Sequence, residues 1–186
     1  LVIADFDGIN SHINRSGVMS CWKKKKWDVC LSNQLNRYYD IWPLRANNWI
    51  ENDCWQNFKY NLKKNKNYNK AIREEVYSKM IKIKKKSKWI KVNSGFGGLA
   101  IYKFHKNLLK LKYSGLTKKG KVISEHVLFN NLLRNKLKYN LYINPKLINS
   151  SWNNHTSQLK SNYKNILWQK IKNILINVFV FVFGTN

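Results

Sequence analysis

Short apolar runs separated by polar stretches dominate the first 150 residues, and they predict strands joined by loops and helices. The first run, Leu1 to Ala4, stops at two aspartates and indicates a buried strand. Further strands are expected at residues 27–33, on both sides of a glycine cluster at 95–98, and at 141–145; helices are expected at 71–80 and from residue 124 onward. Together these elements predict an α/β domain with a mixed sheet flanked by helices.

Three other stretches are less regular. Residues 11–26 are polar and predict a mobile loop, and residues 57–70 are rich in Lys and Asn and predict an exposed segment. From residue 167 to 183 the apolar positions have helical spacing, but the run is shorter than the roughly twenty residues that span a bilayer. This last stretch predicts either a packing helix or strand, or an interfacial membrane segment. We therefore expect a catalytic part at 1–160 and a tail at 161–186.

The charge balance of the chain is strongly basic. Its 35 Lys and Arg against 9 Asp and Glu give a net charge of +26, which favours contact with polyanions or anionic lipid. An AT-rich genome, which enriches Lys, Asn, Ile and Tyr, is the competing explanation. Three cysteines without paired C-x-x-C spacing indicate neither a disulfide framework nor a zinc site, and they favour a reducing, cytoplasmic location.

Because acidic residues are scarce, those in apolar surroundings are candidates for a functional role. Asp5 and Asp7 form an Asp-x-Asp motif at the end of the first predicted strand. Alternate residues of a strand face the same side, so both carboxylates are expected to reach one divalent ion, and hard oxygen ligands favour Mg²⁺ or Mn²⁺. The alternative is a pair of turn or helix-cap aspartates.

Two further features are candidates for binding or catalysis. The glycines at 95, 97 and 98 allow a tight turn or the close approach of a phosphate or sugar, but they match neither G-x-G-x-x-G nor a P-loop, and a plain turn is the alternative. Ser124 is a plausible helix N-cap, which leaves Glu125 in the first helical turn.

A strand followed by Asp-x-Asp-Gly also matches the first motif of the haloacid dehalogenase phosphatases. In that family the leading aspartate is the nucleophile, the second is an acid/base, and a downstream acidic pair holds magnesium. Beyond Glu75 the sequence contains only one carboxylate side chain, Glu125, so this set cannot be completed.

A second resemblance accounts for more residues. In order along the chain, the segments at 5–7, 27–28, 38–45, 94–98 and 124–127 resemble the metal-dependent GT-A glycosyltransferases, in particular hypothetical bacterial and viral glycosyltransferases related to the fungal capsule mannosyltransferases. The resemblance extends from Leu1 to His155. It implies a hexosyltransferase of polysaccharide biosynthesis that moves a sugar from a nucleotide-sugar donor to a glycan or lipid-linked acceptor.

The resemblance also implies roles for individual residues. Asp7 would bind Mn²⁺ or Mg²⁺ on the donor diphosphate, Asp5 would reach the ribose or a metal-bound water, and His155 would be a third metal ligand. Glu125 would contact or deprotonate the acceptor hydroxyl, as a general base within hydrogen-bond reach can do.

Four more residues receive binding roles from the same resemblance. Gly97 and Gly98 would let the backbone approach the sugars, and Asp40 and Arg45 would bind sugar hydroxyls and phosphate. In the resembling fold the nucleotide-binding strands precede the Asp-x-Asp motif. Since this sequence begins with Leu1 inside a predicted strand, we expect the N-terminal nucleotide-binding half to be missing.

The basic net charge is compatible with two kinds of partner. Peripheral contact with an anionic membrane would suit a lipid-linked acceptor. The alternative function is a basic, non-enzymatic protein that binds nucleic acid, in which Lys and Arg neutralise phosphates and Trp and Tyr stack on bases. No recognised nucleic-acid-binding motif supports this alternative.

Overall fold

The computed structural model describes residues 1–161, which fall into two compact units. The first unit is Leu1–Ser151, and the second begins at Trp152 and contains the short 3-10 helix η4, Asn154–Thr156. The predicted tail element at 167–183 lies outside the described residues.

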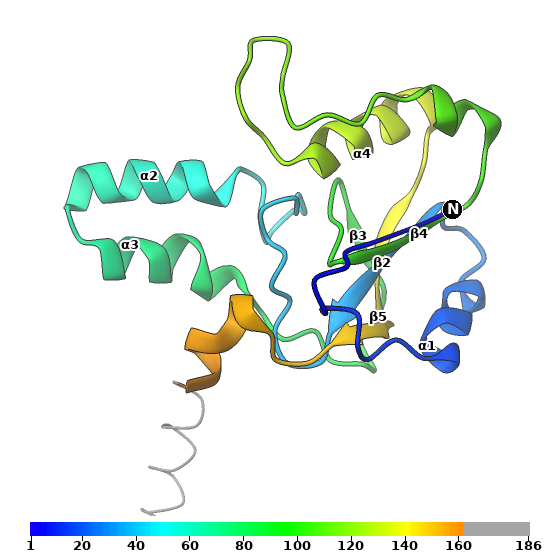
Figure 1. Cartoon of the computed structure of the whole chain (residues 1–186), viewed down its shortest axis with the longest axis horizontal. Coiled ribbons are helices and arrows are strands. Elements are labelled where there is room, and N and C mark those ends of the chain that lie inside the picture. The colour runs from blue at the N-terminus through cyan, green and yellow to red at the C-terminus, as the bar shows by residue number, and fades with distance from the viewer. Residues whose placement is uncertain (162–186) are drawn as a thin grey trace, which may run out of the picture. The chain divides into compact units, whose positions relative to one another are not determined.

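The first unit is built on a sheet of five strands (Figure 1), and the predicted mixed sheet flanked by helices is confirmed. The strands are β1 (Val2–Ala4), β2 (Val29–Gln34), β3 (Ile90–Val92), β4 (Leu99–Tyr102) and β5 (Leu141–Ser150), in the order β1-β4-β2-β5-β3. Strands β2 and β5 are parallel, and every other neighbouring pair is antiparallel. It follows that β1, β2 and β5 run in one direction and that their carboxyl ends lie at the same edge of the sheet.

Helices and short 3-10 segments connect these strands. Between β1 and β2 lie α1 (Arg15–Met19) and η1 (Ser20–Lys23), and between β2 and β3 lie α2 (Cys54–Asn65), α3 (Tyr68–Glu75) and η2 (Tyr77–Lys79). Between β4 and β5 lie η3 (Lys106–Lys110) and α4 (Glu125–Leu137). Figure 1 shows α2 and α3 packed side by side, projecting away from the sheet.

Strand β2 is the central strand of the sheet, and every one of its residues is buried. Its apolar side chains Val29, Cys30 and Leu31 are fully enclosed, and the polar side chains that follow them at its carboxyl end are buried too. A buried polar side chain needs hydrogen-bond partners, so this end of β2 has to lie against other polar groups. The predicted strands at β2 and β4 and the start of α4 at Glu125 are confirmed.

The first strand differs from its prediction. We expected a buried strand that carries both aspartates, but β1 ends at Ala4 and pairs only with β4 at the sheet edge, so Val2 is 58% exposed. Asp5 and Asp7 therefore lie beyond the strand, and the argument from strand periodicity is wrong for them. A local apolar pattern indicates a strand but not how many neighbours it will have.

The segment predicted to be a mobile loop contains helices, and so does the segment at 57–70, which is mostly exposed as predicted. Residues 11–26 hold α1 and η1, and Asn14 starts α1 by accepting a hydrogen bond from the Gly17 amide at 2.9 Å. Residues 57–70 belong mostly to α2 and α3. The Lys- and Asn-rich composition concealed α2 because its buried residues are only Cys54 and Phe58, too few to produce a clear apolar period.

Candidate functional site

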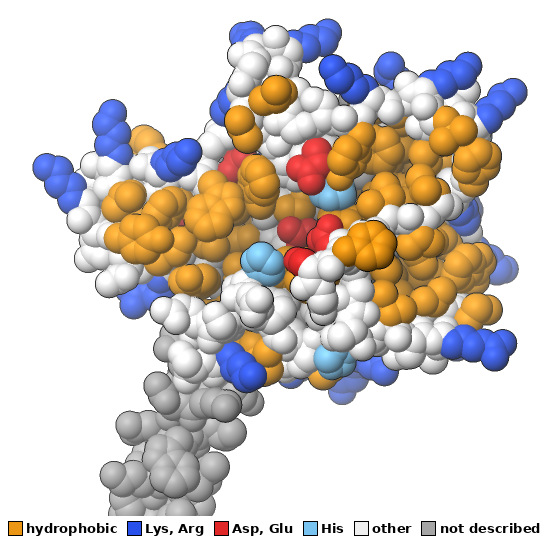
Figure 2. Space-filling model, in the orientation of Figure 1, with side chains coloured by type: hydrophobic (Ala, Val, Ile, Leu, Met, Phe, Trp, Pro, Cys, Tyr) orange, Lys and Arg blue, Asp and Glu red, His pale blue; other side chains and the backbone are white. Residues whose placement is uncertain are grey.

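Most of the predicted site residues of the first unit lie near the sheet edge where β1, β2 and β5 end. Asp5 and Asp7 follow β1, Asp40 lies in the loop after β2, and Gly97 and Gly98 form the turn that leads into β4. Figure 2 shows acidic side chains together at the centre of the pictured face, between apolar areas.

The Gly97 carbonyl is the centre of the polar contacts at this edge. It accepts three hydrogen bonds, from Ser32 Oγ at 2.7 Å, Gln34 Nε2 at 2.9 Å and Asn149 Nδ2 at 2.8 Å. All three donor side chains are buried. At its φ of +81°, a Cβ would lie 2.7 Å from Ser32 Oγ, so the turn requires glycine both for its conformation and for space.

Gly98 ties the Asp-x-Asp segment to the same turn. Its carbonyl accepts from the Asp5 amide and from Asn10 Nδ2, both at 3.0 Å, and Asn10 Nδ2 also donates to the Asp5 carbonyl at 2.7 Å. Asn149 Nδ2 donates to Asn10 Oδ1 at 2.9 Å. The backbone at Asp5 is therefore held against the end of β5 and the start of β4.

Asp40 is a carboxylate of the site whose pKa is raised well above its ordinary value. Burial raises its pKa to about 7, against a hydrogen bond from the Gly97 amide at 2.7 Å that lowers it, and the negative charges of Asp5 and Glu125 raise it further. Three carboxylates from different elements thus act on one another. A carboxyl with a pKa near neutrality in such surroundings is a frequent sign of a functional site.

Asp7 belongs to the same electrostatic neighbourhood through Tyr39. Burial raises the pKa of the Tyr39 phenol, and the charges of Asp40, Asp5 and Asp7 raise it further. Asp5 and Asp7 are both exposed, and Asp7 Oδ1 accepts from the Ile9 amide at 3.2 Å. Phe6, between them, is fully exposed.

Glu125 contributes from the first turn of α4, and its side chain is 37% exposed. Neighbouring His126 is buried, stacks on Phe96 with ring centroids 3.8 Å apart, and lies with Nε2 3.2 Å from Tyr113 Oη. Burial lowers the pKa of His126 to about 4 although Glu125, 3.6 Å away, favours its charged form. His126 is therefore neutral at physiological pH. Ser124 is the N-cap residue, but its side chain makes no capping hydrogen bond.

The Arg45 side chain contacts its own loop and Asp53, and its backbone pairs with Ser94. One guanidinium nitrogen donates to the carbonyls of Trp42 and Leu44 at 2.8 and 2.6 Å, and another lies 3.9 Å from Asp53 Oδ2. Asp53 also caps α2 by accepting from the amides of Trp55 and Gln56. These contacts hold the loop, and the phosphate contact expected of Arg45 stays a prediction.

His155 lies in η4, in the second unit, and its predicted role as a metal ligand stays a prediction. Within residues 1–161 no group of three His, Cys, Asp or Glu side chains is arranged to hold a metal ion. No helix in that range combines the length and the apolar character that a membrane span requires. The three cysteines, all buried, are free thiols.

Several residues of the candidate site were not predicted from the sequence. Gln34 and Asn149 fix the glycine turn, Tyr39 lies among the aspartates, and Tyr113 and His126 adjoin Glu125. A usable signal existed for Gln34 and Asn149, because each is an amide at the end of an otherwise apolar run, where a buried polar group must find partners. Tyr113 lies in a polar loop and had no such signal.

Comparisons with protein-family models, curated proteins and solved structures find no match to this chain.

Proposed function

We propose that this chain is the metal- and acceptor-binding part of a GT-A-like glycosyltransferase, which moves a sugar from a nucleotide-sugar donor to a glycan or lipid-linked acceptor. The observation that supports it best is the raised pKa of Asp40, to which Asp5 and Glu125 both contribute. Donor and acceptor must meet at one carbon atom, so the groups that bind the diphosphate and the acceptor hydroxyl need to share one small region.

The surplus of negative charge fits a divalent cation. Beyond burial, the negative charge of Asp5 raises the pKa of Asp40, and the charges of Asp40, Asp5 and Asp7 together raise that of Tyr39. Mg²⁺ is commonly held by one or two carboxylates together with substrate phosphates, so Asp5 and Asp7 suffice as protein ligands. Such an ion would stabilise the charge that develops on the departing diphosphate.

The remaining residues of the site have distinct tasks in this proposal. Asp7 and Asp5, both exposed, hold the cation. Gly97 and Gly98 let the turn pack against Ser32 and Tyr39, and this turn holds the Asp40 carboxylate and the Asp5 backbone through hydrogen bonds. Glu125 takes the proton from the acceptor hydroxyl. His126, neutral and stacked on Phe96, shapes the apolar wall beside Glu125 and carries no proton to the reaction.

The first test is cation binding, which can be measured on this chain alone. Titration calorimetry with Mn²⁺ should show about tenfold weaker binding to Asp7→Asn, since the substitution removes charge at the metal without changing volume. Glu74→Gln on α3 removes the same charge away from the acidic cluster, which is Asp5, Asp7, Asp40 and Glu125. It is the matched control and should bind as the unmodified chain does. Equal affinity of all three proteins would contradict the metal role of Asp7.

The second test is sugar transfer by the complete enzyme. Release of labelled sugar from a panel of nucleotide-sugars should require Mn²⁺ or Mg²⁺ and should be lost in Asp7→Asn and Glu125→Gln, with the fold monitored by circular dichroism. Transfer that is undiminished in Asp7→Asn, or independent of divalent metal, would refute the proposal.

We further propose a cytoplasmic location with peripheral contact to anionic membrane, which would bring the site to a lipid-linked acceptor. The net charge of +26 supports it, because each Lys or Arg near such a surface contributes about 1 kcal/mol. Binding to anionic vesicles should exceed binding to neutral ones and weaken with salt. Deleting residues 174–183 should reduce it even at high salt, and equal weak binding to both vesicle types would contradict it.

A further inference from the structure

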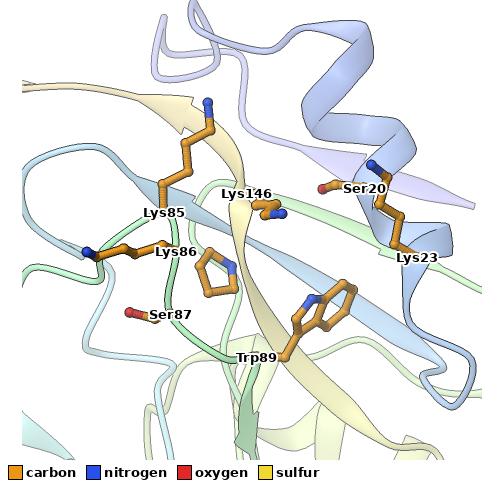
Figure 3. A pocket seen from close by; sticks show the side chains of 8 residues that line it. Ser20, Lys23, Lys85, Lys86, Ser87, Trp89 and Lys146 are labelled. Carbon is orange, nitrogen blue, oxygen red and sulfur yellow. The ribbon is translucent and has the colours of Figure 1, made fainter.

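A pocket of about 510 Å³ lies among η1, the loop that precedes β3, and the middle of β5 (Figure 3). Its lining includes four lysines from three separate segments: Lys23, Lys85, Lys86 and Lys146. Trp89 lines it as well, and Figure 3 shows it on the same loop as Lys85 and Lys86. None of the acidic residues of the candidate site lines this pocket.

The lysines of the pocket lack carboxylate partners in the described part of the chain. The ion pairs Arg45–Asp53 and Glu125–His126 involve other side chains, and the like charges of four lysines that line one pocket repel one another. Side chains that line the pocket offer hydrogen-bond donors and no carboxylate acceptor. This arrangement favours a ligand with several negative charges, and phosphate groups match lysine well.

Trp89 adds a second kind of recognition. Its ring is half-buried and packs edge-on against Tyr142 with centroids 6.1 Å apart, so its position is fixed by the fold. Lys24 lies next to it, with Nζ 4.5 Å from the centre of the Tyr142 ring and 5.9 Å from that of Trp89. Any nucleobase can stack on an indole ring, because every base has a flat aromatic face.

We propose that this pocket binds a nucleotide, with its phosphates on Lys85, Lys86 and Lys146 and its base against Trp89. The pocket volume suits one small molecule, since ligand sites usually measure about 300–1,000 Å³. Phosphate charge meets the lysines and the planar base meets the indole, a combination that neither a sugar phosphate nor inorganic phosphate supplies. The inference does not depend on glycosyl transfer.

The experiment is calorimetric titration of the full chain in the presence of EDTA. Without divalent metal the acidic cluster repels phosphates, so binding there does not contribute. ATP should bind more tightly than ADP, ADP more tightly than AMP, and adenosine should show no binding, because the affinity follows phosphate charge. Pyrophosphate should bind more weakly than ADP because it lacks the base.

Matched variants locate the site. Lys85→Ser with Lys86→Ser should weaken ATP binding by about tenfold, whereas Lys63→Ser with Lys64→Ser on α2, which removes the same charge elsewhere, should change it by less than about twofold. Trp89→Leu should weaken ATP but leave pyrophosphate unchanged, and Trp89→Phe should restore ATP binding. Circular dichroism identifies any variant that does not fold.

Three results would overturn the proposal. Equal losses in both double-lysine variants would mean that binding follows net charge. Adenosine that binds as tightly as ATP would exclude the lysines as the phosphate site. A thymidine oligonucleotide or anionic vesicles that bind through Lys85 and Lys86, while ATP does not, would assign the pocket to nucleic acid or to membrane instead.

Discussion

Asp40→Asn should stabilise the folded chain at neutral and alkaline pH and have little effect in acid. The pKa of Asp40 is raised from its ordinary 3.8 to about 7, chiefly by burial and then by Asp5 and Glu125. About three pH units correspond to on the order of 4 kcal/mol of destabilisation once the buried carboxyl is ionised. Asparagine cannot ionise, yet its Oδ1 can still accept the Gly97 amide hydrogen bond.

The sign of the pH dependence follows from proton uptake. Between about pH 4 and pH 7 the folded chain holds a proton on Asp40 that the unfolded chain releases, so the contribution of Asp40 to stability falls as pH rises through this window. His126, whose pKa is lowered to about 4, contributes in the opposite direction. It is present in both proteins, so comparing Asp40→Asn with the unmodified chain removes its contribution.

Urea unfolding at a series of pH values measures the difference directly. The free energy of unfolding of Asp40→Asn relative to the unmodified chain should be near zero at about pH 4 and grow to a few kcal/mol by about pH 8. Added Mn²⁺ should shrink this advantage, because a cation bound at the cluster favours the ionised form of Asp40. Asp28→Asn, outside the cluster, is the control for the chemical change itself.

A difference that stays constant from about pH 4 to pH 8 would refute the reasoning, because it would show that Asp40 titrates alike in the folded and unfolded chains. A difference of the opposite sign would show that the Gly97 hydrogen bond, or a positive charge, outweighs burial.

Further predictions concern the turn, a helix cap and the histidine. Gly97→Ala should destabilise the fold by about 3 kcal/mol or more in urea unfolding, because its Cβ would lie 2.7 Å from Ser32 Oγ, whereas Gly120→Ala, at a φ of +72° but with open space, should cost about 1–2 kcal/mol. Asp53→Ala should lower stability by about 1–2 kcal/mol and the thermal midpoint with it, since α2 loses its cap. The ring protons of His126 should titrate near pH 4 by NMR, with stability rising between about pH 4 and pH 6.5; a midpoint near 6.5 would contradict its burial.

Local features of the structure were readable from residue patterns. The apolar run at 29–31 is the interior strand β2, the glycine pair occupies a turn with φ above +80°, and Ser124 precedes α4. Each of these depends on neighbours in sequence: on burial of consecutive residues, on backbone freedom, or on the start of a helical turn. The weakly amphipathic helix α2 was missed for the same reason, because its buried face is small.

Tertiary structure alone decided how these parts combine. The Gly97 carbonyl collects donors from Ser32, Gln34 and Asn149, which are 52 to 65 residues away in sequence, and the charges that act on Asp40 come from Asp5 and Glu125. Local periodicity holds no information about such pairings, because strand order and direction depend on which surfaces bury each other across the whole chain. The sequence by itself thus singled out carboxylates as candidates, and the fold determined that they lie close enough to act on one another.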